Sequence, residues 1–357
     1  MRVLHVISEM GAGGAETLVA GMASRGHEYG WTSAVASGGG FRAGALASEG
    51  VATFPVPLAL RSRMGALRAA WATRDVISRF RPDIVLAHNV GASLVARLAL
   101  VPGRRRPLVS VFHGVADSDL TTAARILGRT SDLLVAVSPA SSAQLTGAGL
   151  SEPVVIRNAV FTRHPVFGRR EIRASLGVAS GTPVALCPAR LEPQKRHDVL
   201  LEAWSRLSGD AELWLAGDGS LRAELESRRD GLGCRRVRFL GTREDVPDLI
   251  EAADITVLTS DWEGLPLAML ESLAAARPVV ATAVGGIGDV LSDGGGLLVP
   301  PGDPAAVTKA LETLLYDPSA RASVASEGLR TIQREYDSHA LMKAYDEMLR
   351  LALEGKR

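Results

Sequence analysis

Residues 255–283, ITVLTSDWEGLPLAMLESLAAARPVVATA, contain two short apolar runs separated by a helical pattern. The runs ITVLTS (255–260) and PVVATA (278–283) lack the strict alternation of a strand with one solvated face, so we expect both to be buried on two sides. The segment between them has apolar residues at helical spacing. A buried strand, a helix and another buried strand form the unit from which parallel sheets are built.

The same alternation extends in both directions along the 357 residues. It predicts an α/β fold of two doubly wound parallel-sheet domains in tandem. Strands are predicted at VLHVI (3–7), TSAVAS (32–37), IVLAH (84–88), LVSVFH (108–113), LLVAVS (133–138), PVALCPAR (183–190), ELWLAGDG (212–219), VRFLGT (237–242) and GGLLVP (295–300), besides the two above.

The domain join is predicted after VVIRNAV (154–160), because FTRHPVFGRR is polar and contains Pro and Gly. We predict an N-terminal, acceptor-binding domain at 1–162, a linker with a short helix at 163–182, and a C-terminal domain at 183–336. Residues 337–357 form a periodic helix that could pack on either domain, including back on the N-terminal one. Ligands are expected at the carboxyl ends of the strands, in a cleft between the domains.

Composition excludes several classes of protein. With 46% apolar and 22% charged residues, the chain is neither disordered nor fibrous. The sequence contains no run of about eighteen apolar residues, the length needed to span a membrane. The apolar run before Ser8 is too short for a secretory signal. Cys187 and Cys234 lack the spacing of a metal site or disulfide framework, which fits a reducing compartment. We therefore predict a soluble, cytoplasmic protein.

Charge is distributed unevenly along the chain. Residues 1–162 hold 16 Arg, no Lys and 10 acidic residues, a net charge of +6, whereas the remainder carries −5. This basic half suggests an anionic partner, either a membrane surface or a phosphorylated substrate. A basic amphipathic segment, residues 54–74, could lie on an anionic membrane, or could be an ordinary helix with an Arg-rich outer face. The side chains concerned are Arg61, Arg63, Arg68, Arg74 and Trp71, with a second basic run at Arg104 to Arg106.

The loop GAGGAE (11–16) follows the first predicted strand and opens a helix. Gly13 and Gly14 would let backbone N–H groups approach a phosphate, although a merely tight turn explains them too. A dinucleotide fingerprint needs a third Gly and a later acid, and here Glu16 follows and the second strand ends in SGGG. NAD binding is therefore disfavoured.

Two further loops follow strands of the second half. ARLEPQKR (189–196) presents Arg190 and Lys195, which could clamp a diphosphate or simply form a solvated loop.

SDWEGLPLAMLES (260–272) places Glu263 before a helix and Glu271 inside it, and Pro266 suits the first helical turn. Backbone from Leu265 onward could bind an anion, with Gly264 permitting a close turn and the two carboxylates accepting from sugar hydroxyls. Alternatively, Glu263 is a partner of the helix dipole and Glu271 a solvent-facing acid.

These segments resemble a known family. The spacing E-x7-E, inside S-x-x-E-G-x-P-x-x-x-x-E-S-L-A, is similar to that of the retaining glycosyltransferases of family 4, which have the GT-B fold. Arg190 and Lys195 match the family's R-L-x-x-x-K, and VVIRNAV resembles its V-I-P-N-G-V with Arg157 for Pro and Ala159 for Gly. Further similarity lies in AGDG (216–219), FLGTREDV (239–246), RPVVATAVGG (277–286), GGLLVPPGD (295–303) and, more weakly, GGAE and FHG (112–114).

The resemblance implies a GT-B fold, with two Rossmann-like domains facing a central cleft. It also implies that Arg190 and Lys195 bind the donor diphosphate, that Glu271 accepts from the ribose and that Glu263 contacts the transferred sugar. The other implied contacts are backbone of Gly264, Leu265 and Pro266 at the phosphates, Gly13 and Gly14 at the distal phosphate, Thr242 and Arg243 near the base, and His113 beside the sugar. Asp289 stands where the family has Glu, and no role is carried over to it. Taken alone, His113 could equally be a structural group.

The function implied is a retaining glycosyltransferase that moves a sugar, commonly from a UDP-sugar, to a glycan, lipid-linked or small-molecule acceptor. The D-x-D run Asp117-Ser118-Asp119 lies in the acceptor half, so we expect no metal and no cofactor besides the donor substrate. No nucleic-acid partner is expected. Two alternatives stay open: another GT-B enzyme, such as an epimerase or phosphorylase, and a non-catalytic subunit that binds sugar nucleotides.

Overall fold

The computed structural model describes residues 1–357 except 59–61, 102–105, 162–164, 235, 293 and 356–357. Arg61, Arg104 and Arg105 of the predicted basic segments therefore lie outside the described residues, as does the start of the predicted linker. The chain divides into two compact units, residues Met1–Ala159 with Ser338–Arg357 (unit 1) and residues Val160–Asp337 (unit 2).

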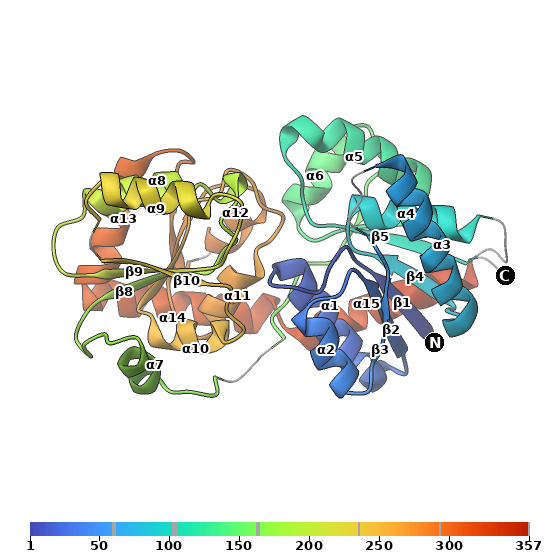
Figure 1. The fold of residues 1–357 in the computed structure, drawn as a ribbon, viewed down its shortest axis with the longest axis horizontal. Helices are drawn as coiled ribbons and strands as arrows, with labels where there is room; N and C mark the ends of the chain where they lie inside the picture. The colour runs from blue at the N-terminus through green and yellow to red at the C-terminus, as the bar shows by residue number, and fades with distance from the viewer. Residues whose placement is uncertain (59–61, 102–105, 162–164, 235, 293, 356–357) are drawn as a thin grey trace. The chain divides into compact units, whose positions relative to one another are not determined.

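Unit 1 is built on a sheet of seven described strands in the order β3-β2-β1-β4-β5-β6-β7, every pair parallel. Helices cover both of its faces (Figure 1). The strands are β1 Arg2–Val6, β2 Thr32–Ser37, β3 Ala52–Pro55, β4 Ile84–Ala87, β5 Leu108–Phe112, β6 Leu133–Ala136 and β7 Val154–Val155. The helices are α1 Gly14–Arg25, η1 Gly26–Tyr29, α2 Phe41–Ser48, α3 Arg63–Phe80, α4 Val90–Leu100, α5 Asp117–Thr130, α6 Pro139–Gly147 and α15 Ser338–Glu354.

Unit 2 repeats this plan with six described strands in the order β10-β9-β8-β11-β12-β13, again parallel. The strands are β8 Val184–Cys187, β9 Glu212–Ala216, β10 Val237–Gly241, β11 Ile255–Leu258, β12 Val279–Thr282 and β13 Gly296–Val299. The helices are α7 Arg169–Ser175, η2 Pro193–Lys195, α8 His197–Ser205, α9 Arg222–Gly231, α10 Val246–Ala252, α11 Leu267–Ala274, α12 Gly286–Leu291, α13 Pro304–Tyr316 and α14 Pro318–Glu335.

The sheet of unit 2 is apolar on both faces because helices pack on both. One core cluster joins the strands to α8, α9 and α13, and another joins them to α7 and α10 on the opposite face. The central strands are entirely buried, which explains why their sequences do not alternate. The prediction of two parallel-sheet, doubly wound domains is confirmed.

The C-terminal helix α15 packs within unit 1. Trp31 Nε1 donates to Asp346 Oδ1 at 2.8 Å, and Arg25 Nη1 donates to Ser338 Oγ at 2.8 Å. Tyr345 is buried in the same contact region, with 1% of its surface exposed. The helix is therefore a structural part of unit 1 although the whole of unit 2 precedes it in the chain.

The strand order reverses direction at one point in each sheet, between β1 and β4 in unit 1 and between β8 and β11 in unit 2. Loops leaving the carboxyl ends of the two strands at such a point run to opposite faces of the sheet. They leave a crevice between them where α/β proteins bind ligands. These two switch points are where the predicted site residues are to be sought.

Candidate active site

The switch point of unit 2 brings together the segments that follow β8 and β11. Asp261 N donates to Gln194 O at 2.9 Å, and Gln194 Nε2 donates back to Trp262 O at 2.8 Å. Thr259 Oγ1 is 3.0 Å from Lys195 O. Hydrogen bonds to backbone carbonyls thus fix the η2 turn against the loop after β11, although these segments lie more than sixty residues apart in sequence.

Arg196, which follows η2, adopts a left-handed backbone conformation with φ of 47°. Its side chain donates to Asp198 Oδ1 at 3.0 Å and to Asp261 Oδ1 at 2.9 Å. The Asp198 hydrogen bond raises the pKa of the guanidinium further, with Asp261 acting in the same direction. Two carboxylates therefore stabilise a conformation that costs about 1–3 kcal/mol for a residue other than Gly.

Lys195 and Glu263 form an ion pair at this point. Lys195 Nζ donates to Glu263 Oε1, and Ser260 Oγ donates to the same oxygen at 2.6 Å. The two charged side chains are 16% and 8% exposed. The sequence suggested both residues for the site but not their contact with each other. A carboxylate buried to this extent needs such donors, because desolvation would otherwise disfavour its charge.

The segment containing Arg190 lies between glycines. A Cβ on Gly217 would be 2.0 Å from Ala189 O, and one on Gly219 would be 2.4 Å from Leu191 O. AGDG (216–219) thus packs closely against the backbone of this segment. The Arg190 side chain is exposed, and its charge acts on the nearby Glu192 carboxylate. An exposed guanidinium of this kind can reach an anion.

The start of α11 differs slightly from the prediction. Pro266 is not in the first helical turn but caps it, with φ −70° and ψ 121°, and α11 begins at Leu267. The N–H of Gly286 donates to Gly264 O at 2.8 Å. Glu271 is half-buried on α11, which disfavours the alternative interpretation as a solvent-facing acid. Pro266 fits the cap position because its ring fixes φ while leaving ψ free to take the extended value of a cap residue.

Gly285, between β12 and α12, holds the loop of Glu263 in place. Its backbone has φ 50° and ψ −138°, and a Cβ there would be 1.8 Å from Glu263 O. No side chain can occupy this space without moving the loop. Gly285 and Gly286 belong to a segment that resembles the family, but the resemblance alone did not explain why a glycine is needed at position 285.

Thr242 and Arg243 lie after β10, at the edge of the sheet. Thr242 is exposed, whereas Arg243 donates to Asp245 through Nε at 2.7 Å. This hydrogen bond raises the pKa of the Arg243 guanidinium. The structure therefore does not group these two residues with the Lys195–Glu263 pair through any contact between described residues.

In unit 1, Gly13 caps α1 and Gly14 is its first residue. The side chain of Glu16 folds back over this turn, so that a Cβ on Gly13 would be 2.1 Å from Glu16 Oε2. The position predicted for a phosphate is thus covered by a carboxylate. The following SGGG segment packs against the same loop, because a Cβ on Gly40 would be 2.5 Å from Met10 O.

His113 belongs to a row of three stacked histidines at the switch point of unit 1. The ring of His113 stacks on His88 with 6.0 Å between centroids, and His88 stacks on His5 at 5.4 Å. His5 Nδ1 and His88 Nε2 are 3.1 Å apart. His5 and His88 were not among the predicted site residues. Their predicted strands, VLHVI and IVLAH, gave no sign that they lie next to each other and to LVSVFH.

Burial keeps this histidine row uncharged. It lowers the pKa of His5 and of His113 to about 4, and lowers the pKa of His88 well below its ordinary value, with the two neighbouring rings adding to the effect. His5 Nε2, His88 Nδ1 and His113 Nε2 are buried without a hydrogen-bond partner among the described residues. Neutral imidazoles can both donate and accept, so this row suits hydroxyl groups better than anions.

Asp117 and Asp119, the D-x-D run, lie in the first turn of α5, where acidic side chains favour the helix dipole. Within the described part of the chain, no group of three or more His, Cys, Asp or Glu side chains is arranged to hold a metal ion.

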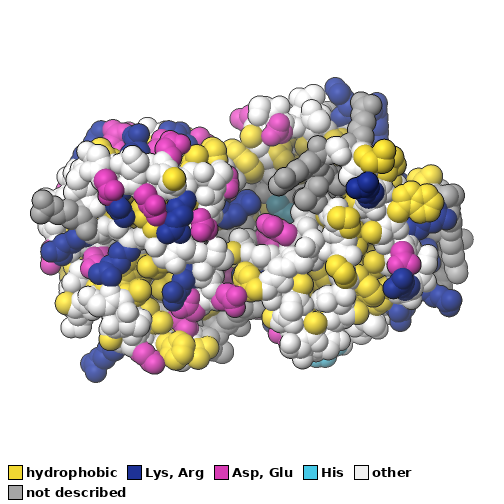
Figure 2. All heavy atoms as spheres, in the orientation of Figure 1, with side chains coloured by type: hydrophobic (Ala, Val, Ile, Leu, Met, Phe, Trp, Pro, Cys, Tyr) yellow, Lys and Arg dark blue, Asp and Glu magenta, His cyan; other side chains and the backbone are white. Residues whose placement is uncertain are grey.

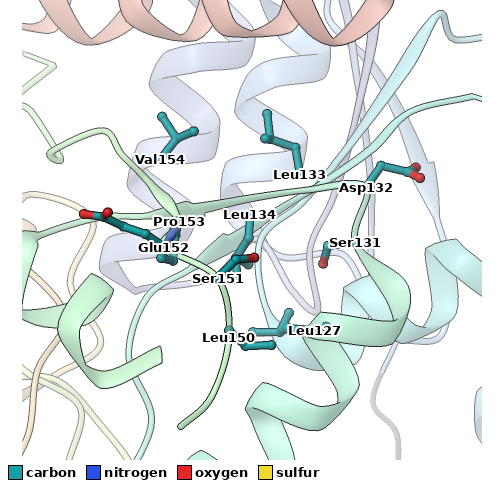
Figure 3. Close-up of a pocket in the computed structure, with 11 residues that line it drawn as sticks. Leu127, Ser131, Asp132, Leu133, Leu134, Leu150, Ser151, Glu152, Pro153 and Val154 are labelled. Carbon is teal, nitrogen blue, oxygen red and sulfur yellow. The ribbon is translucent and has the colours of Figure 1, made fainter. Parts of the chain in front are cut away.

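A hollow of about 180 Å³ lies elsewhere, at the amino ends of β6 and β7 and the end of α5. The carboxylates of Asp132 and Glu152 point in opposite directions from its rim (Figure 3). None of the predicted site residues lines it.

Family models match both halves of the chain. "Glycosyl transferases group 1" matches residues 182–317, and "Glycosyltransferase Family 4" matches residues 12–164. The lipopolysaccharide core biosynthesis glycosyltransferase LpsE of Rhizobium meliloti is 33% identical over 62% of this chain and 65% of its own length. Glycogen synthase of Mycobacterium tuberculosis is 29% identical over 78% of this chain and 71% of its own length.

Solved structures share the fold. Anabaena HepE in complex with UDP-glucose has a TM-score of 0.86 at 24% identity, over 98% of this chain and 99% of that one. WaaG, a glycosyltransferase of lipopolysaccharide biosynthesis, has a TM-score of 0.78 at 18% identity, over 97% and 99%. The fold is therefore GT-B. The chain is a GT-B glycosyltransferase of the family 4 type, as the motif resemblance implied.

Proposed function

We propose that this protein transfers a sugar from a nucleotide diphosphate sugar, with UDP as the nucleotide, to an acceptor hydroxyl with retention of configuration. The observation that carries the proposal is the Lys195–Glu263 pair at the switch point of unit 2, beside the start of α11. A cation for a diphosphate stands next to a carboxylate that can accept from sugar hydroxyls. The UDP and UDP-glucose complexes of Anabaena HepE support the choice of nucleotide.

The proposed donor contacts in unit 2 follow the layout of the loops. Arg190 is exposed, and Lys195 forms an ion pair with Glu263 at the switch point. Both cations would bind the diphosphate. The backbone of Gly264, Leu265 and Pro266 would complete the phosphate site, Glu271 would accept from the ribose, and Thr242 and Arg243 would contact the base.

Charge stabilisation is the main catalytic contribution in this proposal. As the bond between the anomeric carbon and the diphosphate breaks, negative charge develops on the leaving group, and Arg190 and Lys195 are placed to stabilise it. Two side-chain cations would fill the part that Mg²⁺ takes elsewhere, so we propose metal-independent transfer. The acceptor oxygen would attack from the face of the departing diphosphate, which takes up the hydroxyl proton.

In unit 1, Gly13 and Gly14 would form a turn that binds a phosphate, and His113 would bind a sugar hydroxyl. Because the Glu16 carboxylate covers Gly13 and like charges repel, the Glu16 side chain has to turn away before a phosphate approaches this turn. His113 would meet a hydroxyl as a neutral ring, consistent with the lowering of its pKa by burial.

Thermal unfolding tests the donor. UDP, GDP, ADP, dTDP and their sugars are added without metal and then with Mg²⁺. A ligand at 100 times its dissociation constant stabilises by about 2.7 kcal/mol, which gives a clear rise in Tm. We expect a response to UDP and UDP-sugars that is indifferent to Mg²⁺. Absence of a response to every nucleotide would overturn the proposal.

Experiment separates transfer from two other classes of function for the same fold, another GT-B enzyme and a non-catalytic subunit. An epimerase would consume the nucleotide sugar without an acceptor, and a phosphorylase would need inorganic phosphate. A non-catalytic subunit would bind the donor without turnover, and Glu263→Gln would then alter affinity alone. Product analysis with and without acceptor distinguishes all three, and the intact Lys195–Glu263 pair favours an active transferase.

The acceptor side carries a membrane proposal. On α3, Met64, Leu67 and Trp71 are 62%, 48% and 71% exposed and lie along one stripe, with Arg68 beside them. Figure 2 shows apolar and basic side chains next to each other over the region of α3 and α4. We propose that this face binds an anionic membrane surface, so that the enzyme works at the cytoplasmic side of a membrane. Its acceptor would be a glycan, a lipid-linked molecule or a small molecule. Among the described helices, none is long and apolar enough to cross a bilayer.

Vesicle cosedimentation tests this contact. We expect binding to vesicles with anionic lipid, weaker binding to neutral ones, and loss of binding in Trp71→Ser. Phe167→Ser is the matched control, because Phe167 is 45% exposed on unit 2. Equal sedimentation with both vesicle types, or an equal effect of both variants, would contradict the membrane contact.

A further inference from the structure

Two buried hydroxyl groups hold Glu263 in place, one by binding its carboxylate and the other by binding the backbone of the first. Ser260 Oγ donates to Glu263 Oε1 at 2.6 Å, and Thr282 Oγ1 donates to Ser260 O at 2.6 Å. Ser260 is 1% exposed and Thr282 is fully buried. These contacts thus run from the end of β12, through the end of β11, to the carboxylate.

The two oxygens of Glu263 have different surroundings. Oε1 accepts from both Lys195 and Ser260. Oε2 has no hydrogen bond to a described residue, and it is absent from the fully enclosed polar atoms that lack a partner. One oxygen is therefore occupied by the protein's own donors, while the other faces accessible space.

Lys195 alone would not fix this arrangement. A terminal carboxylate torsion is broad, and an ammonium group on a flexible stem attracts either oxygen equally well. Ser260 is three residues away on the same loop, and its backbone is held by Thr282. A short, rigid donor of this kind selects one oxygen and sets the plane of the carboxylate.

We propose that Ser260 is a positioning residue that, supported by Thr282, directs Glu263 Oε1 toward Lys195 and keeps Oε2 for a hydroxyl of the transferred sugar. The inference rests on the proposed function, because it assumes a nucleotide sugar at this site. It assigns the sugar-dependent part of donor binding to a residue that does not itself touch the donor.

The decisive variant is Ser260→Ala, which removes the hydroxyl and adds no volume. Ser260→Thr keeps a hydroxyl and serves as the rescue. Thr256→Val is the matched control. Thr256 lies on β11, the strand that precedes the Ser260 loop, and is fully buried with its Oγ1 2.8 Å from Ser272 Oγ, so this variant loses a buried hydroxyl contact away from Glu263. Tm without ligand shows whether all four proteins fold equally well.

Two readouts are compared: the rise in Tm with UDP and with the UDP-sugar that the wild type binds, and the steady-state kcat and KM. We expect Ser260→Ala to respond to UDP as the wild type does, to lose most of the additional response to the sugar, and to lower kcat about tenfold or more. Ser260→Thr should recover at least half of the lost response, and Thr256→Val should match the wild type.

The inference is overturned if Ser260→Ala matches Thr256→Val in both readouts, or if it loses the responses to UDP and to UDP-sugar to the same extent, as a purely structural defect would. Failure of the proposed function gives a different result: the wild type itself would then respond to no nucleotide. In that case the inference falls with it.

Discussion

The switch points of the two units have the same strand topology but different electrostatics. Between β8 and β11, ion pairs join Lys195 to Glu263 and Arg196 to Asp261 across the two loops. Between β1 and β4, and next to them on β5, burial keeps three stacked histidines neutral. The topology decides where side chains meet, and residue type then decides the charge of the meeting place: paired ions in unit 2, and neutral rings in unit 1.

The largest expected effect comes from breaking the charged switch point at its support. In Gly285→Ala the new Cβ would overlap Glu263 O, and φ of 50° is unfavourable for Ala, so the loop has to shift. A displacement near 1 Å in a positioned group can lower turnover about 100-fold. Transferase kinetics check this.

Gly288→Ala is the control. Gly288 lies in α12, the helix that Gly285 caps, and a Cβ at this position would have no neighbouring atom within 4 Å outside the helix backbone. Wild-type kinetics in Gly285→Ala would show that the loop position does not depend on this glycine.

The next effect comes from removing the cation. Lys195→Ala leaves Glu263 without its ion pair and the diphosphate without a charge-assisted contact of about 1.5–3 kcal/mol, so turnover should fall at least about tenfold. Lys343→Ala breaks an ion pair with Glu347 whose side chains are about two-thirds exposed, where the loss should be close to zero. Unchanged turnover in Lys195→Ala would remove the diphosphate role.

The smallest effect concerns the neutral switch point. Because the folded-state pKa values of the histidine row lie below the ordinary value of 6.5, the unfolded chain binds more protons than the folded one between about pH 4 and 6.5. Stability should therefore be complete above pH 6.5 and fall as the pH drops toward 4. Urea unfolding at pH 7.5 and 5 measures this.

His88→Gln should reduce that loss, because burial lowers the pKa of His88 well below its ordinary value, whereas the exposed His27→Gln should leave the loss unchanged. The same pH dependence in all three proteins would show that the histidine row does not control it.

Much of the fold could be predicted from the sequence, because buried parallel strands and their helices leave local patterns. VLHVI and ITVLTS are such patterns, and both form central strands. The strand order leaves no local pattern, and so the contact of Lys195 with Glu263 across 68 residues could not be derived from spacing. For the same reason Lys195 and Glu263 could be suggested as site residues while the role of Ser260 between them could not.

Side-chain conformations were less predictable still. The Glu16 carboxylate turns back over Gly13, a choice among rotamers that a Gly-rich pattern does not reveal. His5 and His88 each sit in an ordinary strand sequence and become conspicuous when three strands bring their rings together. Pro266 ends up as a cap and not in the first turn, a shift of one residue that sequence signals do not resolve.

The position of α15 has a consequence for how the protein is made. Because α15 completes unit 1 but follows unit 2 in the chain, a ribosome synthesises all of unit 2 before the last element of unit 1 emerges. Trp31 and Tyr29 can contact Asp346 and His339, respectively, only after some three hundred further residues have been translated. Unit 2 is contiguous and can fold during synthesis, whereas unit 1 is completed last.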